Sequence, residues 1–455
     1  MTSAVLGTLL AGLLVLGFAM VGETLLGRTS RDLLGWNESF LIGLGTCAAA
    51  LFPLSLIASR GALDAELGVI VLSSVIVAVR RLTRRAVPRS PNPSGDLRTV
   101  ATDGIDLSLL TSIVFLTLFF GALNLWHGHS WDSIQVWGTR AKLLFIQGGL
   151  SRQWFPEDPY DSRLLAYPPL ISFFEALLAR VRGSFDFDAL KPIFFPFYVS
   201  MLLSTYTAAR TLCSRRWALA ATLLLALLPE LTTGAAAGGY VDMPLAAFVA
   251  AVVAASLRTN GTAAGWRSPL PWLIGSMTTA KQEGTVLAMT AGLGIFLWWM
   301  LERPRRLSSR LRSEWTAAAV VLAFISARIS YVQWIGIHDT TWGPLDAEHR
   351  ARALKSLGLV ASLCLRFMLE PKTWGLFWPA FFLASALIAA AGLARLTCLA
   401  AVTAATIVVY STIFLLTNWS IEQHIEGAYS RLLAQLAPAA AVVIGAAGSR
   451  IWARS

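Results

Sequence analysis

Long apolar runs separated by short polar segments recur along the whole chain. A run of about 17 to 25 apolar residues is long enough for a helix to cross the hydrocarbon core of a bilayer. By length and apolarity we expect about thirteen spans, at residues 3–22, 39–58, 66–79, 107–125, 191–209, 217–233, 241–257, 270–280, 284–301, 315–336, 375–394, 396–417 and 429–449. The short pair 270–280 and 284–301 is typical of a broken or re-entrant helix. The pattern predicts an all-α, polytopic transmembrane protein.

Basic residues gather in alternate loops. Residues 80–98 hold six arginines and one acid, residues 303–312 hold five arginines and no acid, and Arg215 and Arg216 form a smaller pair. Cytoplasmic loops carry such an excess of Lys and Arg, so we expect these three segments inside. The alternation then places 126–190, 234–240, 281–283, 337–374 and 418–428 on the non-cytoplasmic face.

The long outer loops contain amphipathic patterns. Apolar residues recur at helical spacing over 133–150, which predicts a helix on the membrane surface. Tyr167-Pro168-Pro169 precedes an apolar run to Val181 that is too short to span, so we expect a second surface helix there. Residues 346–366 predict a third.

Composition agrees with the membrane prediction and excludes other classes. Hydrophobic residues are 56% of the chain and charged residues 14%, below the roughly 25% of soluble domains. The net charge of +11 comes from arginines in short loops, which argues against nucleic-acid binding. The four cysteines lack CxxC spacing and predict neither a disulfide framework nor a metal site. His127-Gly-His129 is only a weak metal pattern, no nucleotide-binding motif lies in a suitable setting, and the first run lacks the basic start of a cleaved signal peptide.

A Pro- and Ser-rich segment, 86–96, predicts a cytoplasmic linker. It divides the chain into residues 1–106, with three N-terminal spans and the linker, and residues 107–455, which hold the chemistry-bearing motifs.

Two aspartates stand at predicted outer ends of spans. Asp132 follows the run 107–125 and lies between Trp131 and Trp137. It suits a general base or a metal ligand, or is an interfacial residue among belt tryptophans. Asp242 follows Gly238, Gly239 and Tyr240 and precedes a span. It is a candidate helix N-cap as well as a site residue, because the glycines allow close backbone approach to a ligand.

Two cationic positions accompany them. Lys281 and Glu283 lie between the two short apolar runs, where they form either an intramembrane ion pair or a site for a lipid phosphate. Arg431 lies a few residues into the last span, where a lone arginine either snorkels to the interface or meets a phosphate.

The order of these motifs resembles a known family. Trp131-Asp132-Ser133 with Ala141-Lys142, then Tyr167-Pro168-Pro169-Leu170, Gly239-Tyr240-x-Asp242-x-Pro244, Lys281-x-Glu283-Gly284 and Tyr429-Ser430-Arg431-Leu432-Leu433 are similar, over residues 107–449, to the GT-C membrane glycosyltransferases. Within that superfamily the chain is similar to the protein mannosyltransferase and aminoarabinose transferase group, glycosyltransferase family 39-like. The chain differs by lacking a large C-terminal soluble domain and by its three additional N-terminal spans.

The resemblance implies a function. Such an enzyme moves a sugar, with inversion, from a polyprenyl-phosphate donor to an acceptor on the outer face of a bacterial inner membrane. It implies Asp132 as general base and Asp242 as a second catalytic acid. Lys281, Arg431 and Lys142 would hold the donor phosphate, and Glu283, Tyr167 and Tyr240 would orient substrate. Asp242 and Glu283 could instead hold Mg²⁺ or Mn²⁺, whose preferred ligands are oxygens. The missing soluble domain favours a lipid, glycan or small acceptor.

Two other classes compete with a glycosyltransferase. A secondary transporter or lipid flippase also needs intramembrane charges and broken helices, but it predicts repeated halves and charges near the midplane. A polymer ligase or polymerase predicts arginine- and histidine-rich outer loops instead of the Asp132 motif.

Overall fold

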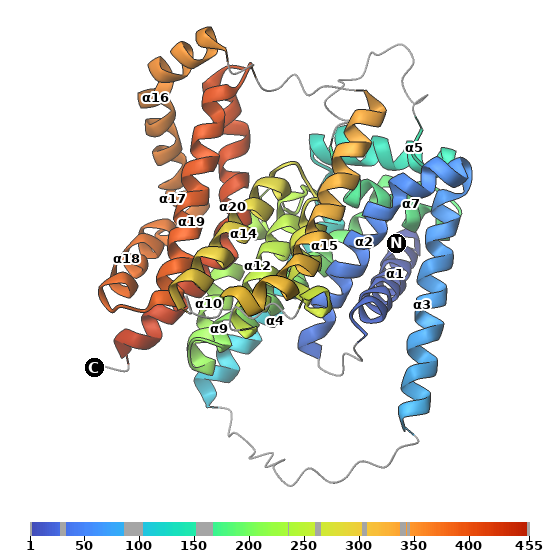
Figure 1. The fold of residues 1–455 in the computed structure, drawn as a ribbon, viewed down its shortest axis with the longest axis horizontal. Helices are drawn as coiled ribbons and strands as arrows, with labels where there is room; N and C mark the ends of the chain where they lie inside the picture. The colour runs from blue at the N-terminus through green and yellow to red at the C-terminus, as the bar shows by residue number, and fades with distance from the viewer. Residues whose placement is uncertain are drawn as a thin grey trace.

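The computed structural model describes residues 2–27, 33–85, 103–151, 167–234, 236–259, 265–302, 307–336, 343 and 346–452, and the described segments form helices joined by turns, with no β-strand among them (Figure 1). The predicted linker 86–96 and most of the 303–312 loop charges fall outside what can be described. The first half contains α1 (Thr2–Leu26), α2 (Leu33–Ala58), α3 (Ala62–Arg85), α4 (Gly104–Trp126), α5 (Thr139–Gln147), α7 (Leu170–Arg182), α8 (Phe187–Leu190), α9 (Phe194–Arg210), α10 (Arg215–Ala226) and α11 (Pro229–Thr232). The second half contains α12 (Asp242–Arg258), α13 (Pro269–Met277), α14 (Glu283–Glu302), α15 (Leu307–Ile335), α16 (Ala347–Met368), α17 (Pro371–Trp374), α18 (Phe377–Ala390), α19 (Ala394–Ile413) and α20 (Ile421–Trp452).

Seven helices in the described part of the chain are long and apolar enough to cross a membrane: α1, α2, α3, α4, α15, α19 and α20. The other six predicted spans coincide with helices α9, α10, α12, α13, α14 and α18, of which α18 and the Glu283–Trp298 part of α14 are shorter apolar helices. The all-helical membrane class is confirmed, and the count of about thirteen spans is not.

The N-terminal helices share one hydrophobic core with the later ones. Gly22 and Gly43 let α1 and α2 approach so closely that a Cβ on either would meet backbone oxygen of the other helix at 2.1 and 1.9 Å. Phe18 of α1 packs edge-on against Phe174 of α7 at 5.3 Å between ring centroids. Helices from both sides of the predicted boundary near residue 106 therefore pack together.

The predicted second surface helix forms, as α7, but it does not lie on a surface. Its residues from Leu170 to Ala179 are all buried, enclosed by α1, α2 and α5. The physical reason is that a wide apolar face of this helix packs against its neighbours and its two polar residues are enclosed with it. Ser172 Oγ donates to Trp137 O (2.9 Å), and Glu175 is buried.

The other two predicted amphipathic segments are helical too. The first becomes a π-helix, Ser133–Gly138, followed by α5. The third is α16, which places Val360, Cys364 and Met368 at helical spacing in its buried face. In Figure 1, α16 runs alongside α19 and α20.

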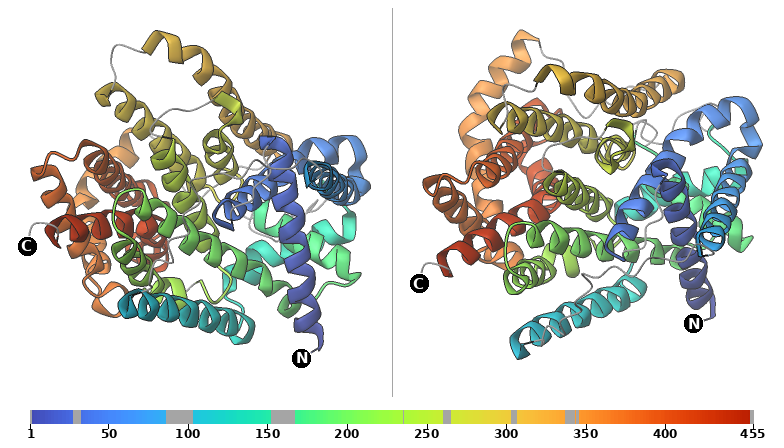
Figure 2. Two further views of the ribbon diagram at one scale, coloured as in Figure 1. Left: turned by 90° about the horizontal axis from the view of Figure 1, so that it is seen from below. Right: turned by 60° about the horizontal axis from the view of Figure 1, so that its bottom comes forward.

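Helices α12 and α20 form the centre of the bundle. Nearly every residue of α12 is buried, and six alanines from Ala246 to Ala255 allow α9, α13 and α20 to pack closely around it. Helix α4, in contrast, lies at the periphery in both views of Figure 2. The polar contacts between Asp242 of α12 and Arg431 and Gln435 of α20 are therefore made between two central helices.

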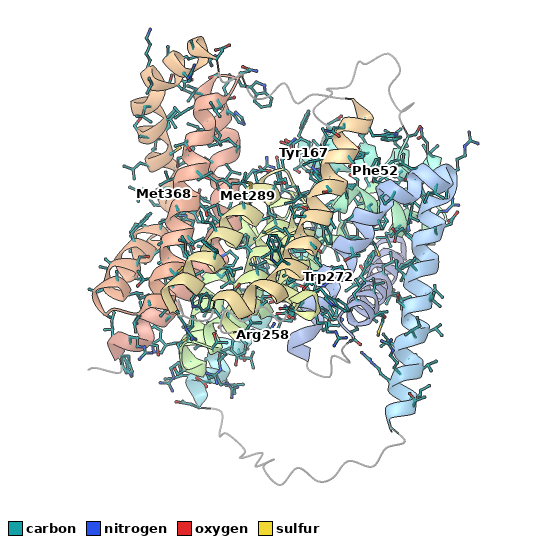
Figure 3. All side chains as sticks on the ribbon, viewed as in Figure 1. Phe52, Tyr167, Arg258, Trp272, Met289 and Met368 are labelled. Carbon is teal, nitrogen blue, oxygen red and sulfur yellow. The ribbon has the colours of Figure 1, made fainter. Side chains whose placement is uncertain are left out.

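Different segments of the chain lie at the two ends of the bundle. Arg258 lies near the lower end in Figure 3 and Tyr167 near the upper end. At the lower end, Arg216 at the start of α10 pairs with Asp103 before α4. At the upper end, Leu63 N after the α2–α3 turn donates to Gly148 O after α5 (2.9 Å). The segments predicted as cytoplasmic and as outer thus separate to opposite ends.

The broken helix predicted around residue 281 is present. Helix α13 ends at Met277 and α14 begins at Glu283. A Cβ on Gly284 would lie 2.0 Å from Met277 O, so only glycine allows this tight connection. The break exposes backbone groups, one of which is satisfied by α7, because Leu170 N donates to Thr279 O (3.1 Å).

Candidate active site

Asp132 is placed by an unusual backbone segment. Helix α4 ends at Trp126, and Ser130 N then donates to Gly238 O (3.0 Å), which joins the first outer loop to the loop before α12. The π-helix begins at Ser133, and Thr139 Oγ1 donates to Ile134 O (2.9 Å) inside it. π-Helices are rare, and their single turns are frequently found at functional sites.

Asp242 begins α12 but does not cap it. Val241 is the N-cap residue, and no side chain caps this helix end. The Asp242 carboxylate instead accepts from Lys281 Nζ (2.8 Å) and Gln435 Nε2 (2.7 Å) at Oδ1, and from Arg431 Nε (2.9 Å) at Oδ2. The side chain is 5% exposed, so its bonds are made inside the protein.

Lys281 lies in the break between α13 and α14 and contacts two carboxylates. Its ammonium group is 2.8 Å from Asp242 Oδ1 and 2.8 Å from Glu283 Oε1. Burial disfavours its charged form, but the two neighbouring carboxylates outweigh burial and raise the pKa of Lys281. Lys281 therefore stays cationic at physiological pH.

Arg431 connects the two aspartates. Its guanidinium donates to Asp132 Oδ2 (2.7 Å) and to Asp242 Oδ2 (2.9 Å), although the two acids are far apart in sequence. It also lies over the ring of Tyr240, 3.8 Å from the centroid. The side chain is 17% exposed and is directed inward rather than snorkelling to an interface.

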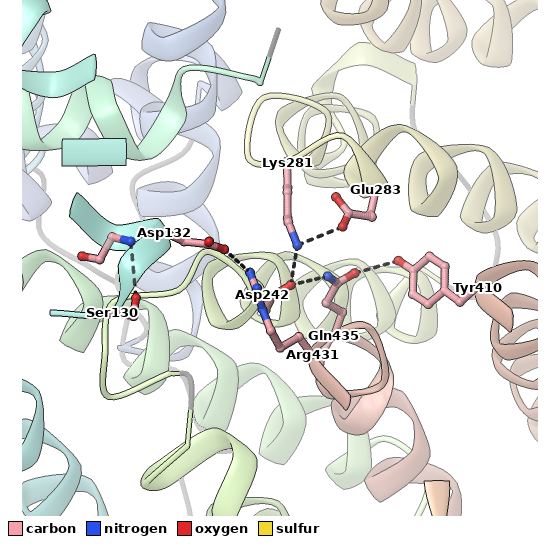
Figure 4. A network of polar contacts seen from close by, with 9 residues as sticks. Ser130, Asp132, Asp242, Lys281, Glu283, Tyr410, Arg431 and Gln435 are labelled. Carbon is pink, nitrogen blue, oxygen red and sulfur yellow. Dashed lines mark hydrogen bonds and ion pairs between the residues drawn. The ribbon is translucent and has the colours of Figure 1, made fainter. Parts of the chain in front are cut away.

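Together these residues form a continuous row of alternating charges, which we call the charge network: Asp132, Arg431, Asp242, Lys281 and Glu283 (Figure 4). Gln435 extends the row by donating to Asp242 and accepting from Tyr410 Oη (2.7 Å). The sequence analysis missed Gln435, which lies one helical turn after Arg431 on the same face of α20.

The charge network faces a cavity of about 600 Å³. Its wall includes Asp132, Lys281, Glu283 and Arg431 from the network, Tyr167 and Tyr240 from the predicted site, and the aromatic residues Trp131, Trp137, Tyr410, Phe414, Trp419 and His424. Asp242 is not in the wall, since it lies beneath the two cations. A cavity with many apolar and aromatic wall residues and a few convergent polar groups is typical of a small-molecule site.

The structure does not bring Lys142 into this group. Lys142 is exposed on α5 and is not part of the cavity wall. The buried cation of that helix is Arg140, which donates to Tyr331 Oη (2.6 Å) and to the backbone oxygen of Tyr167. Arg140 was missed although it is in helical phase with Trp137 and Leu144, whereas Lys142 points the opposite way.

The loop histidines have structural partners. His129 Nδ1 is 3.0 Å from Ser133 Oγ, and its Nε2 is 3.3 Å from Asp188 Oδ1. Burial and the nearby Lys191 lower the pKa of His129. His127 Nδ1 is 2.8 Å from Gly128 O, so the two histidines do not converge on one ligand. The four cysteines are all free thiols.

A divalent cation fits the charge network poorly. Each carboxylate already accepts from Lys281 or Arg431, so an added cation would meet two fixed positive charges. Within the described ranges, no group of three or more His, Cys, Asp or Glu side chains is arranged to hold a metal ion. The cations of the network can donate to an anionic group, and its carboxylates can accept from hydroxyl groups.

Two polar atoms of wall residues are buried and unpaired. Glu283 Oε2 and Trp137 Nε1 have no hydrogen-bond partner among the described residues.

Tyr240 contacts Arg431 through its ring and lies near the carboxylate of Asp132. Burial, and then the carboxylate of Asp132, raise the pKa of its phenol, which stays protonated at neutral pH. It can therefore support the guanidinium of Arg431 with its ring and donate with its hydroxyl.

A scan against protein-family models, a search of curated proteins and a search of solved structures each found no match to this chain.

Proposed function

We propose that this protein is a membrane glycosyltransferase of the GT-C type, transferring a sugar from a polyprenyl-phosphate donor to an acceptor hydroxyl. The observation that supports it best is the charge network, which faces an aromatic cavity from the ends of helices. The proposal includes about thirteen membrane crossings, in which α9, α10, α12, α13, α14 and α18 also take part, and a site on the outer face of a bacterial inner membrane.

The donor phosphate would bind at Arg431 and Lys281. Arg431 uses Nε and one terminal nitrogen on the aspartates, and its other terminal nitrogen has no protein partner in the described residues. Lys281 uses two of its three protons on Asp242 and Glu283. The network has three carboxylates and two cations, so its net formal charge is −1, and the phosphate must engage these remaining donors directly.

Asp242 has a positioning role in this proposal. It touches Lys281, Arg431 and Gln435 and is 3% exposed, so it holds the cations in place instead of meeting the substrate. This differs from the direct catalytic role that the sequence suggested. Preorganised donors aimed at developing negative charge are a large source of catalysis.

Asp132 is the proposed general base. Its Oδ2 accepts from Arg431, whereas Oδ1 has no partner among the described residues and the side chain lines the cavity. The acceptor oxygen attacks the anomeric carbon and its proton passes to Asp132 Oδ1. The bond from that carbon to the phosphate oxygen breaks, and the polyprenyl phosphate leaves with the electron pair toward Arg431 and Lys281. Attack opposite the leaving group inverts the anomeric centre.

The proposal is tested by direct assay. Purified protein in lipid nanodiscs is incubated with a panel of polyprenyl-phosphate sugars, and released sugar and polyprenyl phosphate are followed by mass spectrometry. Cleavage by the wild-type chain that is lost in Asp132→Asn would support the proposal. Cleavage of no donor, together with movement of a labelled polyprenyl-phosphate sugar across the bilayer of proteoliposomes, would favour a flippase instead.

A further inference from the structure

One part of the cavity wall carries no formal charge. It comprises Phe414, Trp419, Gln423, His424 and Gly427, which we call the neutral wall. It is formed by the 3₁₀ turn Phe414–Leu416, the segment after it and the first two turns of α20. The charged residues of the same cavity all belong to the charge network, so the cavity has a charged part and an uncharged part.

Hydrogen bonds outside the cavity fix the conformation of the neutral wall. His424 Nδ1 is 2.7 Å from Thr417 Oγ1, and Trp419 N donates to the same oxygen (3.1 Å). Arg352 of α16 donates to the backbone oxygens of Thr417 (3.3 Å) and Trp419 (3.5 Å), and it is not part of the cavity wall. The Trp419 and His424 rings pack together at 5.0 Å. This side of the cavity is therefore preorganised.

The wall nevertheless offers surface to a ligand. Trp419 is 44% exposed. The Gln423 side chain is exposed, with no partner in the described residues. A Cβ placed on Gly427 would meet nothing within 4 Å, so this glycine opens onto free space.

The neutral wall lies in line with the phosphate-binding cation. Gln423, Gly427 and Arg431 are spaced four residues apart and share one face of α20. With a rise of 1.5 Å per residue, Gln423 lies about 12 Å from Arg431 along the helix and Gly427 about 6 Å. That separation leaves room for a sugar ring between the reacting centre and the far end of the wall.

We propose that the neutral wall is a binding subsite for the uncharged terminal sugar ring of a glycan acceptor. An aromatic face covers the apolar side of a pyranose, and an amide and an imidazole can bond its hydroxyls. A phosphorylated or carboxylated acceptor would need cations, and this wall supplies none. The assignment as an acceptor subsite rests on the proposed glycosyl transfer and narrows its acceptor to a neutral glycan.

The test measures binding without turnover. Saturation-transfer NMR on the full chain in nanodiscs would follow neutral methyl hexopyranosides and the corresponding 6-phosphates. Gly427→Leu fills the open space, and Gly427→Ala adds only a methyl group. Gly292→Leu is the matched control, because Gly292 is also an exposed helical glycine with open space around its Cβ, on α14 and outside the cavity. Trp419→Ala is paired with Trp126→Ala, since Trp126 is exposed outside the cavity.

The loss of glycoside affinity should increase with the size of the side chain introduced at position 427. Neutral glycosides should bind the wild type and Gly292→Leu equally, and bind at least about tenfold more weakly to Gly427→Leu and Trp419→Ala, as loss of a buried aromatic contact implies. Gly427→Ala should lie between, and Trp126→Ala should match the wild type. Tighter binding of the 6-phosphates, no binding by the wild type, or unchanged binding in Gly427→Leu would overturn the subsite.

Two further arms separate the possible outcomes. This arm uses Asp132→Asn, which should bind donor without turning it over. Glycoside binding that persists when this variant is saturated with a polyprenyl-phosphate sugar identifies an acceptor subsite, and displacement by that donor would overturn it in favour of the donor's sugar. Different results would overturn the proposed function and the subsite. If larger side chains at position 427 weaken glycoside binding but no donor is cleaved, glycosyl transfer is overturned. The acceptor assignment then fails too, and the neutral wall is only a sugar-binding site. Donor cleavage with unchanged binding in Gly427→Leu would overturn the subsite alone.

Discussion

Two clusters of acids and bases lie at opposite ends of this bundle and differ in burial. At the lower end, Arg215 and Arg216 pair with Asp103 and Asp106, and three of these four side chains are 33 to 54% exposed. At the upper end, the side chains of the charge network are 5 to 24% exposed. The first cluster joins the starts of α4 and α10, and the second joins four distant segments around a cavity.

The comparison shows that charge pairing alone does not identify a site. Exposed ion pairs contribute little energy and are typical of loop charges that set topology. Buried charges are costly unless fully paired. A row of five charges, of which Asp242 and Lys281 are buried and the other three are partly buried, therefore needs a reason beyond stability where it meets an open cavity. The proposed reason is chemistry on a lipid phosphate sugar.

The sharpest way to break this comparison is to measure which end faces outward. Cysteine at Trp131, which is exposed beside Asp132, should react in intact cells with a membrane-impermeant thiol reagent. Cysteine at Thr83, exposed near the end of α3, should react only after lysis. We expect each introduced cysteine in intact cells to be either labelled or not labelled. Labelling at 83 but not at 131 would reverse the orientation and remove most of the mechanism.

The largest kinetic effect is expected for Asp132→Asn. The change keeps the shape and removes the base, so turnover should fall roughly 10² to 10⁴-fold with little change in donor affinity. Single-turnover rates with a donor that the panel identifies would measure it. Asp103→Asn, in the exposed cluster, is the matched control and should stay near wild type. Equal rates for both variants would remove Asp132 from the mechanism.

Loss of a cation should weaken donor binding and turnover together. Lys281→Ala removes a donor to the phosphate, and a loss on the order of 10²-fold in kcat/KM is expected from the usual contribution of one such donor. Arg431→Ala should lower kcat/KM by a similar factor, and it also removes the hydrogen bond that Arg431 donates to Asp132. Donor-binding curves would separate both from Asp132→Asn. Unchanged donor affinity in both variants would contradict their assignment to the phosphate.

Acid should loosen the loop that carries Asp132. Burial and Lys191 lower the pKa of His129 below its ordinary value of 6.5, so the opened loop binds a proton more readily than the closed one. The stabilising contribution is present above about pH 6.5 and is lost as the pH falls further. Hydrogen exchange of residues 127–138 should therefore speed up severalfold between pH 7 and 5.5, after correction for intrinsic rates. The same slope in His129→Gln would exclude this histidine as the cause.

The smallest effect is expected in the lower cluster. Arg216→Ala removes a pair whose partners are 42 and 54% exposed, so stability should change by less than about 1 kcal/mol. The shift of the thermal unfolding midpoint in nanodiscs would show it, with Arg216→Lys as a charge-conserving control. A large loss of stability would mean that the two ends of the bundle differ less than their exposure indicates.

Several features of the fold could be inferred from local pattern. The helical class and the break before Glu283 follow from hydropathy and glycine, which act over a few residues. The phase of α5 likewise marked Arg140 as the inward cation, because Lys142 is about 200° away around the helix at 100° per residue.

Other features could be decided only by the packed chain. The sequence by itself determined that Asp132, Asp242, Lys281 and Arg431 stand near helix ends, because each follows or opens an apolar run. It left Asp242 equally able to cap its helix. Only tertiary structure placed Arg431 between Asp132 and Asp242 and put Gln435 beneath them, because those contacts join residues 189 to 299 positions apart in the chain. Helix periodicity fixes the face a side chain occupies, and only the packing of α12 against α20 decides what it meets there.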